Sequence, residues 1–351
     1  MRKRSHRLDK MARVYDDEIL PIWSERFGRM LLKGLKVPNK AMVLDVATGT
    51  GYPALEIIKL MDTQSRLVAI EGIGVLLDVA RKKAGDLAAK RIFFRTENPE
   101  AKLGFADGVY DLTVSNLGLL EVDNPQKTLQ DFARVTKPGG QVVVTLPLAG
   151  TFSELHDIFR EVLVKGDKHE TLVRLEEHIS QTPGPDEAAC WLENAGLQDV
   201  EVEVDEFKLL FRSSREFFFA PVIEYGPLVG WKRAAGKGEG MQELFWQIKE
   251  AIDIYFGDKA FEITVKAGCL RGRRPGSLKV RQPQPPREQS QVVEALQEVT
   301  RSGIISEGSS SFREVSGIVL LPDEDVVEIE DDDDQGEAAN NSDDEVTRPR
   351  G

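Results

Sequence analysis

The sequence predicts an α/β fold, with a mostly parallel sheet and helices on both of its faces. Short apolar runs alternate along the chain with segments whose apolar residues recur at helical spacing. These runs are too apolar for strands that have one face in water. Together, the alternation and the apolar strands are typical of parallel strands joined by crossover helices.

Residues 1–40 are expected to form one or two helices that precede the sheet. Between residues 11 and 35 the apolar residues recur at helical spacing. They are Ile19, Ile22, Trp23, Phe27, Met30, Leu31 and Leu35. Pro38 then ends the helical pattern.

Residues 41–150 carry the alternating pattern most clearly. The expected strands are 42–46, 67–71, 91–95, 110–115 and 141–146. The helices expected between them are 54–62, 75–84 and 125–136. This stretch is therefore expected to be the core of the fold.

Residues 151–271 are expected to continue the same domain. Helices are expected at 152–165, 170–180 and 187–194, with Asp186 as the N-cap of the last helix and Gly196 just past its end. Two expected strands, 199–210 and 260–271, flank an insertion at 212–259. Twelve of the 25 aromatic residues lie between residues 207 and 261, so we expect the insertion to be helical and well packed.

Residues 272–351 differ from the rest of the chain in composition. They are rich in Arg, then in Gln and Pro, then in Ser and Gly, and finally in Asp and Glu. Such a segment buries too little apolar surface to offset its ordering entropy, so a disordered acidic tail is expected. The 13 acidic residues between Asp323 and Glu345 equal the whole net charge of −13. The rest of the chain is formally neutral, and a nucleic-acid-binding surface is not expected.

The cellular setting follows from what the composition lacks. No apolar stretch approaches the roughly 20 residues that a membrane-spanning helix needs. The two cysteines, Cys190 and Cys269, are far apart and show no metal-ligand spacing. We therefore expect a reduced, cytoplasmic protein without a membrane span, a disulfide scaffold or a metal site.

A glycine-rich turn follows the first expected strand, within VLDVATGTGYPALEI at 43–57. Gly49 and Gly51 fit the pattern G-x-G-x-x-A, in which the backbone and a helix N-terminus approach a nucleotide. Two carboxylates distinguish the nucleotides. Asp45 would oppose a dinucleotide pyrophosphate, but it suits a ligand that carries an ammonium and a sulfonium group. Glu71 suits the ribose hydroxyls of either ligand.

Three motifs resemble those of the class I S-adenosylmethionine-dependent methyltransferases, in particular the ubiquinone/menaquinone C-methyltransferase-like group. Residues 43–51 (VLDVATGTG) resemble the first motif, 103–111 (LGFADGVYD) the entry into strand four, and 134–140 (RVTKPGG) the turn before strand five. The resemblance covers about residues 15–146. It implies a Rossmann-like, seven-stranded sheet whose last strand is antiparallel.

The resemblance also implies the residues that hold the cofactor, S-adenosylmethionine. The loop backbone would contact the methionine part, Asp45 its ammonium and Glu71 its ribose. Residues after strand three would cover the adenine, and the tip of strand four would face the methyl group. The implied set is Asp45, Ala47, Thr48, Gly49, Thr50, Gly51, Glu71, Glu97, Asn98, Asn116 and Leu117.

The methyl acceptor is expected to be a small apolar or aromatic molecule. The insertion 212–259 would be a lid over the acceptor, or a subdomain whose aromatic residues are its own core. Residues 115–118 (SNLG) differ from the D/N-P-P-Y motif of nucleic-acid amino-methylating enzymes. If the acceptor loses a proton, His156 is the candidate base, with Glu121 and Asp123 as alternatives.

Two other functions stay open at this point. The chain would be a methyltransferase-fold interaction or regulatory protein if its acidic tail, at 315–345, binds a protein partner. It would be a nicotinamide-dependent oxidoreductase if the glycine loop holds a dinucleotide. The sequence does not identify the acceptor molecule.

Overall fold

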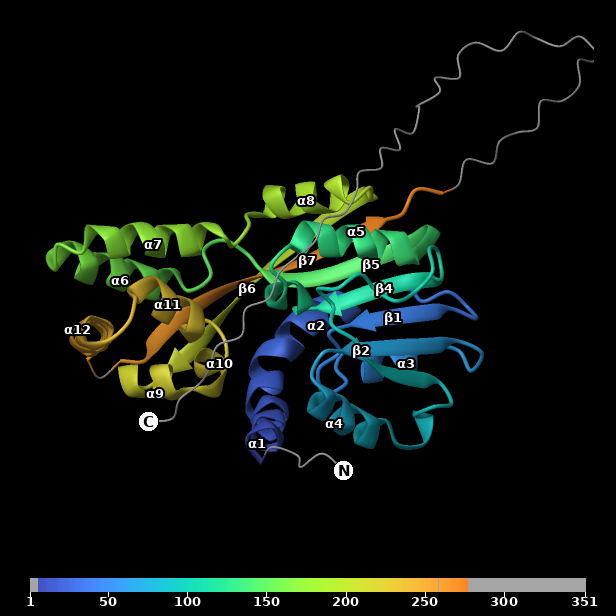
Figure 1. Ribbon diagram of the computed structural model, residues 1–351, viewed down its shortest axis with the longest axis horizontal. Helices are drawn as coiled ribbons and strands as arrows, with labels where there is room; N and C mark the ends of the chain where they lie inside the picture. The colour runs from blue at the N-terminus through green and yellow to red at the C-terminus, as the bar shows by residue number, and fades with distance from the viewer. Residues whose placement is uncertain (1–5, 258, 277–351) are drawn as a thin grey trace, which may run out of the picture. The chain divides into compact units, whose positions relative to one another are not determined.

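The computed structural model describes residues 6–257 and 259–276, and these residues contain a seven-stranded sheet. The strand order is β3-β2-β1-β4-β5-β7-β6 (Figure 1). The strands are β1 (Met42–Val46), β2 (Arg66–Glu71), β3 (Ile92–Thr96), β4 (Tyr110–Asn116), β5 (Thr136–Pro147), β6 (Gln198–Phe211) and β7 (Phe261–Arg273). β1 to β5 pair in parallel, and β7 is antiparallel to both of its neighbours. The predicted fold class is confirmed.

Helices cover both faces of the sheet, as expected for a parallel core. One face is packed by α5 (Pro125–Val135) and α8 (Pro185–Asn194), through residues such as Phe132 and Leu192. The other face is packed by α3 (Ala54–Leu60) and the N-terminal helices, through residues such as Ile57 and Phe27. α4 (Gly74–Ala84) lies beside β2 and β3. Short 3-10 turns follow α4 (η2, Gly85–Leu87) and β4 (η3, Gly118–Glu121).

The N-terminal segment forms three consecutive helices. They are α1 (His6–Val14), a π-helix, η1 (Tyr15–Ser24), and α2 (Glu25–Leu32). The helical segment thus begins five residues before the expected start at residue 11. The π-helix η1, whose turns are wider than those of an α-helix, contains Pro21. Proline has no N–H to donate to a regular helix.

The start of α8 differs from the expectation. Asp186 was predicted as the N-cap, but the N-cap is Gly184, and Asp186 lies in the first turn. Pro185 occupies the first helical position, where its fixed φ and its missing N–H are tolerated. The predicted end is confirmed, because Gly196 has a φ of +82° just past the helix.

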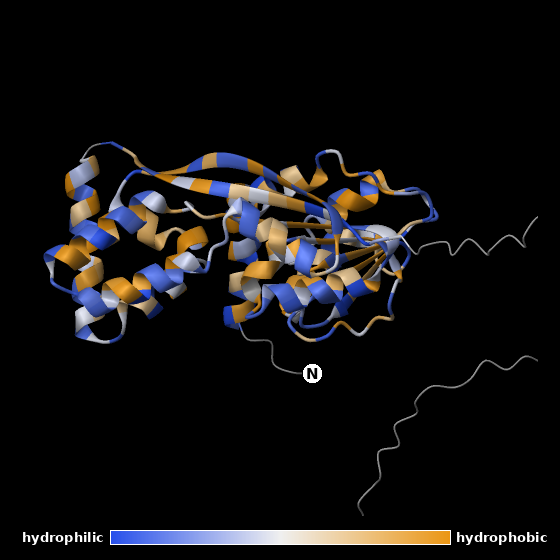
Figure 2. Cartoon of the chain, turned by 90° about the horizontal axis from the view of Figure 1, so that it is seen from above, coloured by the Kyte–Doolittle hydropathy of each residue, from blue (hydrophilic) through white to orange (hydrophobic). Residues whose placement is uncertain are grey.

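A long ribbon of β6 and β7 carries the helical insertion away from the parallel strands (Figures 1 and 2). β5 pairs with β7 only as far as Ala267, whereas β6 pairs with β7 to its beginning, at Phe211 and Phe261. The insertion contains α9 (Ser214–Phe219), α10 (Pro221–Glu224), α11 (Leu228–Ala235) and α12 (Glu239–Phe256). α6 (Ser153–Lys165) and α7 (His169–Ser180) pack against α11 and α12. The predicted helical insertion is confirmed.

The first residues of the predicted tail, 272–274, lie in or directly after β7. β7 runs to Arg273, and the backbone of Arg274 exchanges hydrogen bonds with Gly139 and Gly140. These residues therefore belong to the sheet, because each satisfies backbone groups of β5. The rest of the predicted tail, from residue 277, lies outside the described residues. None of the described helices has the length and hydropathy needed to cross a bilayer.

Candidate functional site

The turn after β1 has a backbone that suits glycine. The φ angles are +59° at Ala47, +55° at Gly49 and +102° at Gly51. At Gly51 a Cβ atom would lie 3.2 Å from the Cβ of Ala80 on α4. The turn therefore combines a left-handed backbone with a close approach to a helix, which only glycine tolerates well at this position.

Asp45 lies beneath this turn and is fully buried. Neither of its carboxylate oxygens has a hydrogen-bond partner, and the hydroxyl of Thr48 has none either. Burial raises the pKa of Asp45 to about 7, and the neighbouring carboxylate of Glu71 also raises it. The side chain of Thr48 and the amide of Ala54 act in the opposite direction. Asp45 is thus a buried acid without a partner cation.

Glu71, at the end of β2, is tied to the same turn. Its Oε2 accepts a hydrogen bond from the Gly49 amide at 3.0 Å, and its Oε1 accepts one from the Ile73 amide at 2.9 Å. Burial raises the pKa of Glu71 against the lowering effect of these bonds. The carboxylate keeps free lone pairs, since each of its oxygens can accept more than one hydrogen bond.

Glu97 and Asn98 follow β3 and lie next to the turn after β2. A Cβ atom on Gly72 would lie 4.0 Å from the Cα of Asn98. Glu97 accepts a hydrogen bond from the Gly104 amide at 2.6 Å, whereas Asn98 is exposed and its side chain accepts from the Glu100 amide. The structure therefore brings the ends of β2 and β3 together.

Asn116 is the last residue of β4 and Leu117 follows it; both are buried. The amide nitrogen of Asn116 donates to the carbonyl of Ser24 at 3.0 Å, and its oxygen accepts from Thr145 at 2.7 Å. Leu117 has a left-handed backbone, with a φ of +67°. The tip of β4 is therefore held against the N-terminal helices.

The N-terminal π-helix supplies neighbours of the glycine turn that sequence reasoning missed. Thr50 donates to Asp16 at 2.6 Å, and Lys83 of α4 forms an ion pair with the same carboxylate. The hydroxyl of Tyr15 lies 3.2 Å from where a Cβ on Gly49 would be. No local motif in the sequence signals these contacts, because they join residues more than 30 positions apart.

The comparison with known proteins identifies the family. A model described as the ubiE/COQ5 methyltransferase family matches residues 2–207, more than half of the chain. The chain belongs to this family. Its members use S-adenosylmethionine as the methyl donor, so the resemblance seen in the motifs is confirmed.

Relatives of the ubiE/COQ5 chain include quinone-modifying enzymes. A demethylmenaquinone methyltransferase of Halalkalibacterium halodurans is 29% identical over 181 residues, which are 49% of this chain and 74% of that protein. One of Renibacterium salmoninarum is 28% identical over 213 residues, 55% of this chain and 86% of that protein. The mitochondrial 2-methoxy-6-polyprenyl-1,4-benzoquinol methylase of Caenorhabditis elegans is 31% identical over 183 residues, 48% and 63% of the two chains.

In this ubiE/COQ5 chain the histidine proposed as a base lies in a buried aromatic cluster. The Nε2 of His156, on α6, accepts a hydrogen bond from the indole N–H of Trp231 at 3.2 Å. Burial lowers the pKa of His156 to about 4, and the nearby Arg160 lowers it further. The imidazole is therefore neutral at physiological pH. Of the alternative bases, Asp123 is exposed, and the side chain of Glu121 lies outside the described ones.

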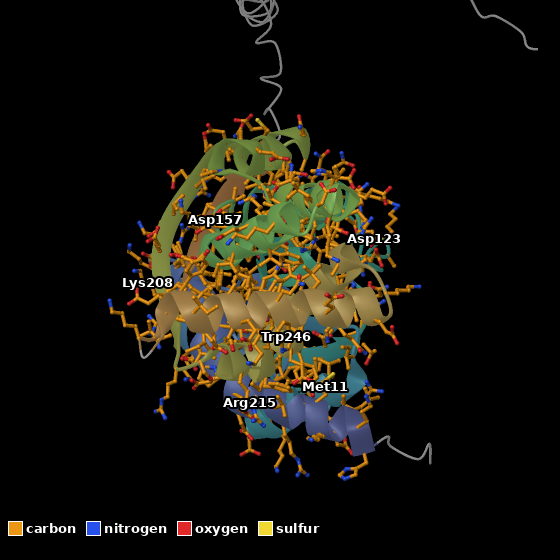
Figure 3. The ribbon with its side chains drawn as sticks, turned by 90° about the vertical axis from the view of Figure 1, so that its left-hand side faces the viewer. Met11, Asp123, Asp157, Lys208, Arg215 and Trp246 are labelled. Carbon is orange, nitrogen blue, oxygen red and sulfur yellow. The ribbon has the colours of Figure 1, made fainter. Side chains whose placement is uncertain are left out.

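The aromatic residues of the insertion pack largely on one another. Phe217 contacts Phe211, Phe218, Trp231 and Phe261 at ring-centroid distances of 4.9 to 6.0 Å. Several others, such as Phe219 and Trp246, are exposed instead. Trp246 projects from α12 with 60% of its surface exposed, and Figure 3 looks onto this helix.

A second aromatic group lies where the insertion meets the parallel core. Trp23 of η1 stacks on Phe152 at 6.0 Å and also contacts Phe27 and Phe207. Phe152 in turn contacts Trp231 at 5.2 Å. A continuous set of rings thus runs from the N-terminal helices into the insertion.

Proposed function

We propose that this ubiE/COQ5 family member binds S-adenosylmethionine at the turn after β1 and transfers its methyl group to a small apolar or aromatic acceptor. The observation that carries the proposal is the Asp45 carboxylate, which is buried beneath the turn and lacks a hydrogen-bond partner. A buried carboxylate without a partner is costly. A cationic ligand would provide that partner, whereas a dinucleotide pyrophosphate would repel it.

The remaining residues fit the other parts of the donor. The backbone of residues 47–51 would hold the methionine part, and the free lone pairs of Glu71 would accept the ribose hydroxyls. Glu97 and Asn98 would border the adenine, and Asn116 with Leu117 the methyl group. When bound, the donor supplies an electrophilic methyl group on a sulfonium sulfur. The protein's part is to orient the two reactants and to exclude water.

The proposed acceptor is an aromatic ring of the quinol type. The relatives are named for acceptors of this kind, demethylmenaquinone and a polyprenyl benzoquinol. The rings of Trp23, Phe152 and Phe207 lie together. Trp23 belongs to η1, and the next residue of η1, Ser24, accepts a hydrogen bond from Asn116 at the tip of β4. Flat apolar side chains of this type suit the face of an aromatic ligand.

His156 is our candidate base if the acceptor must lose a proton. Its Nε2 lone pair is engaged by Trp231, so catalysis requires that movement of α11 frees it. A His156→Gln variant separates the two roles. Loss of kcat with unchanged KM and an altered pH profile would support a base, whereas a lower melting temperature with unchanged kcat would show a packing role.

Titration calorimetry tests the donor site. We expect S-adenosylmethionine to bind and NADH not to bind. We expect Asp45→Ala and Glu71→Ala each to weaken donor binding at least about tenfold, which corresponds to about 1.4 kcal/mol. Absence of donor binding at millimolar concentration would overturn the proposal. Transfer of a labelled methyl group to quinol-type acceptors then tests the acceptor class.

We further infer from the sequence alone that the acidic segment 315–345 binds a protein partner, and that the protein is cytoplasmic. Deletion of residues 277–351 should abolish partner binding and leave methyl transfer unchanged. Retention of the partner by the truncated chain would contradict the first inference, and fractionation of cells tests the second.

A further inference from the structure

We propose that binding of the methyl donor releases a proton from Asp45, so that donor affinity rises with pH through the neutral range. This inference rests on the proposed function, because it assigns the donor's ammonium group to the space beside Asp45. It adds a coupling between donor binding and proton concentration that the family assignment does not contain.

The geometry around Asp45 favours the neutral acid when no ligand is bound. The side chain is 0% exposed, and neither carboxylate oxygen makes a hydrogen bond of regular geometry, although the Thr48 side chain and the Ala54 amide lie close enough to lower the pKa of the acid. Burial outweighs these two donors, and a buried carboxylate without a partner cation is stabilised by taking up a proton. The raised pKa of Asp45, about 7, agrees with this geometry.

The charged groups around Asp45 do not supply a cation. Glu71, from β2, raises its pKa further. Asp16 of η1 and Lys83 of α4 form an ion pair with each other, and Asp16 also accepts a hydrogen bond from Thr50. From β4, the hydroxyl of Ser115 donates to the Val46 carbonyl at 2.9 Å. From α3, the backbone amide of Ala54 lowers the pKa of Asp45, but an amide carries no positive charge.

A ligand ammonium reverses this preference, because an adjacent cation stabilises the carboxylate. With a pKa of about 7, Asp45 would release about 0.8 of a proton per donor bound at pH 6.5. Because the ligand's amino group begins to lose its own proton over this range, donor affinity should rise about fivefold between pH 6 and pH 8. Well above pH 8 the ligand's own amino group, whose pKa is about 8, must instead take up a proton.

The experiment is titration of the full chain with S-adenosylmethionine at pH 6.5, 7.5 and 8.5, in buffers with different heats of ionisation. The dependence of the observed heat on buffer gives the number of protons exchanged. We expect release at pH 6.5, little exchange near pH 7.5 and uptake at pH 8.5. Infrared difference spectra should show loss of a protonated carboxyl band on binding at pH 6.5.

Two variants sharpen the result. Asp45→Asn has the same shape but cannot ionise, so both the proton release and the infrared band should disappear. Glu56→Gln, which removes a partly exposed acid on α3 that pairs with Lys59, should behave like the unmodified chain. Donor binding without release at pH 6.5 would overturn this inference and leave the proposed function standing. No donor binding at any pH would instead overturn the proposed function.

Discussion

Arg134 shows at the scale of one residue what two of the family motifs do. Its guanidinium donates to the carbonyls of Leu103 and Phe105 at 2.9 and 2.7 Å. It also forms ion pairs with Asp107 at 2.8 Å and Asp131 at 2.6 Å. The segments 103–111 and 134–140 are therefore one structural unit, which fixes the loop that enters β4.

Replacement of Arg134 by alanine should destabilise the fold. Several carbonyl and carboxylate groups would lose a charged donor, and we expect a loss of about 2–3 kcal/mol in the free energy of unfolding. Urea denaturation measures it. Lys137→Ala is the matched control, because Lys137 is more exposed and its ammonium pairs with Asp111. An equal loss in both variants would contradict the special role of Arg134.

His156 should make stability depend on acid. Its pKa is lowered from 6.5 to about 4 in the folded chain, so the unfolded chain binds the proton more tightly. The folded state is therefore fully stable with respect to this group above pH 6.5 and loses about 3 kcal/mol as the pH falls to 4. Melting temperatures between pH 7 and pH 4 test this, with His156→Phe as the comparison. The same acid sensitivity in His156→Phe would assign the effect to other groups.

At the scale of elements, the π-helix η1 connects parts of the site that are far apart in sequence. Asp16 holds Thr50 in the glycine turn, Ser24 holds Asn116 at the tip of β4, and Trp23 stacks at the base of the insertion. A widened helix changes which side chains point to the same side. η1 thereby reaches both the proposed donor site and the region proposed for the acceptor.

Loss of the Asp16 carboxylate should weaken donor binding without unfolding the protein. In Asp16→Asn the glycine turn keeps its backbone but loses a charge-assisted bond and the ion pair with Lys83. We expect the Kd for S-adenosylmethionine to rise about five- to thirtyfold. Asp17→Asn is the control, since Asp17 is the next residue on the same helix and is exposed. Equal effects of both variants would argue against a specific bond.

These elements also show what the sequence could and could not predict. β1 was predicted with its observed bounds, and the glycine turn was placed, because both depend on neighbours within a few residues. The partners of that turn, Tyr15 and Asp16, were not predicted. Their contacts depend on how a distant helix packs, and no local pattern records this. The same holds for the bond between His156 and Trp231, which joins residues 75 positions apart.

At the scale of the molecule, two truncations should have different effects. Removal of residues 277–351 leaves all the described contacts in place, so the melting temperature should stay within about 2 °C. Removal of 272–351 also deletes Arg274, which donates to the carbonyls of Arg134 and Thr136 at 2.7 and 2.6 Å. We expect that second truncation to cost about 3 kcal/mol and roughly 5–10 °C. Scanning calorimetry compares the two, and equal melting temperatures would show that the end of β7 is dispensable.

The ribbon of β6 and β7 would allow the helical insertion to be replaced by one from another protein. The chain leaves the sheet after Phe211 and returns at Phe261, and these two residues are partners in the same ladder. The insertion therefore begins and ends at neighbouring points, roughly 5 Å apart. Its length and sequence can change without altering the register of either strand, provided that the new segment covers α6 and α7. The half proposed to bind the donor can thus serve as a fixed frame onto which segments suited to other acceptors are grafted.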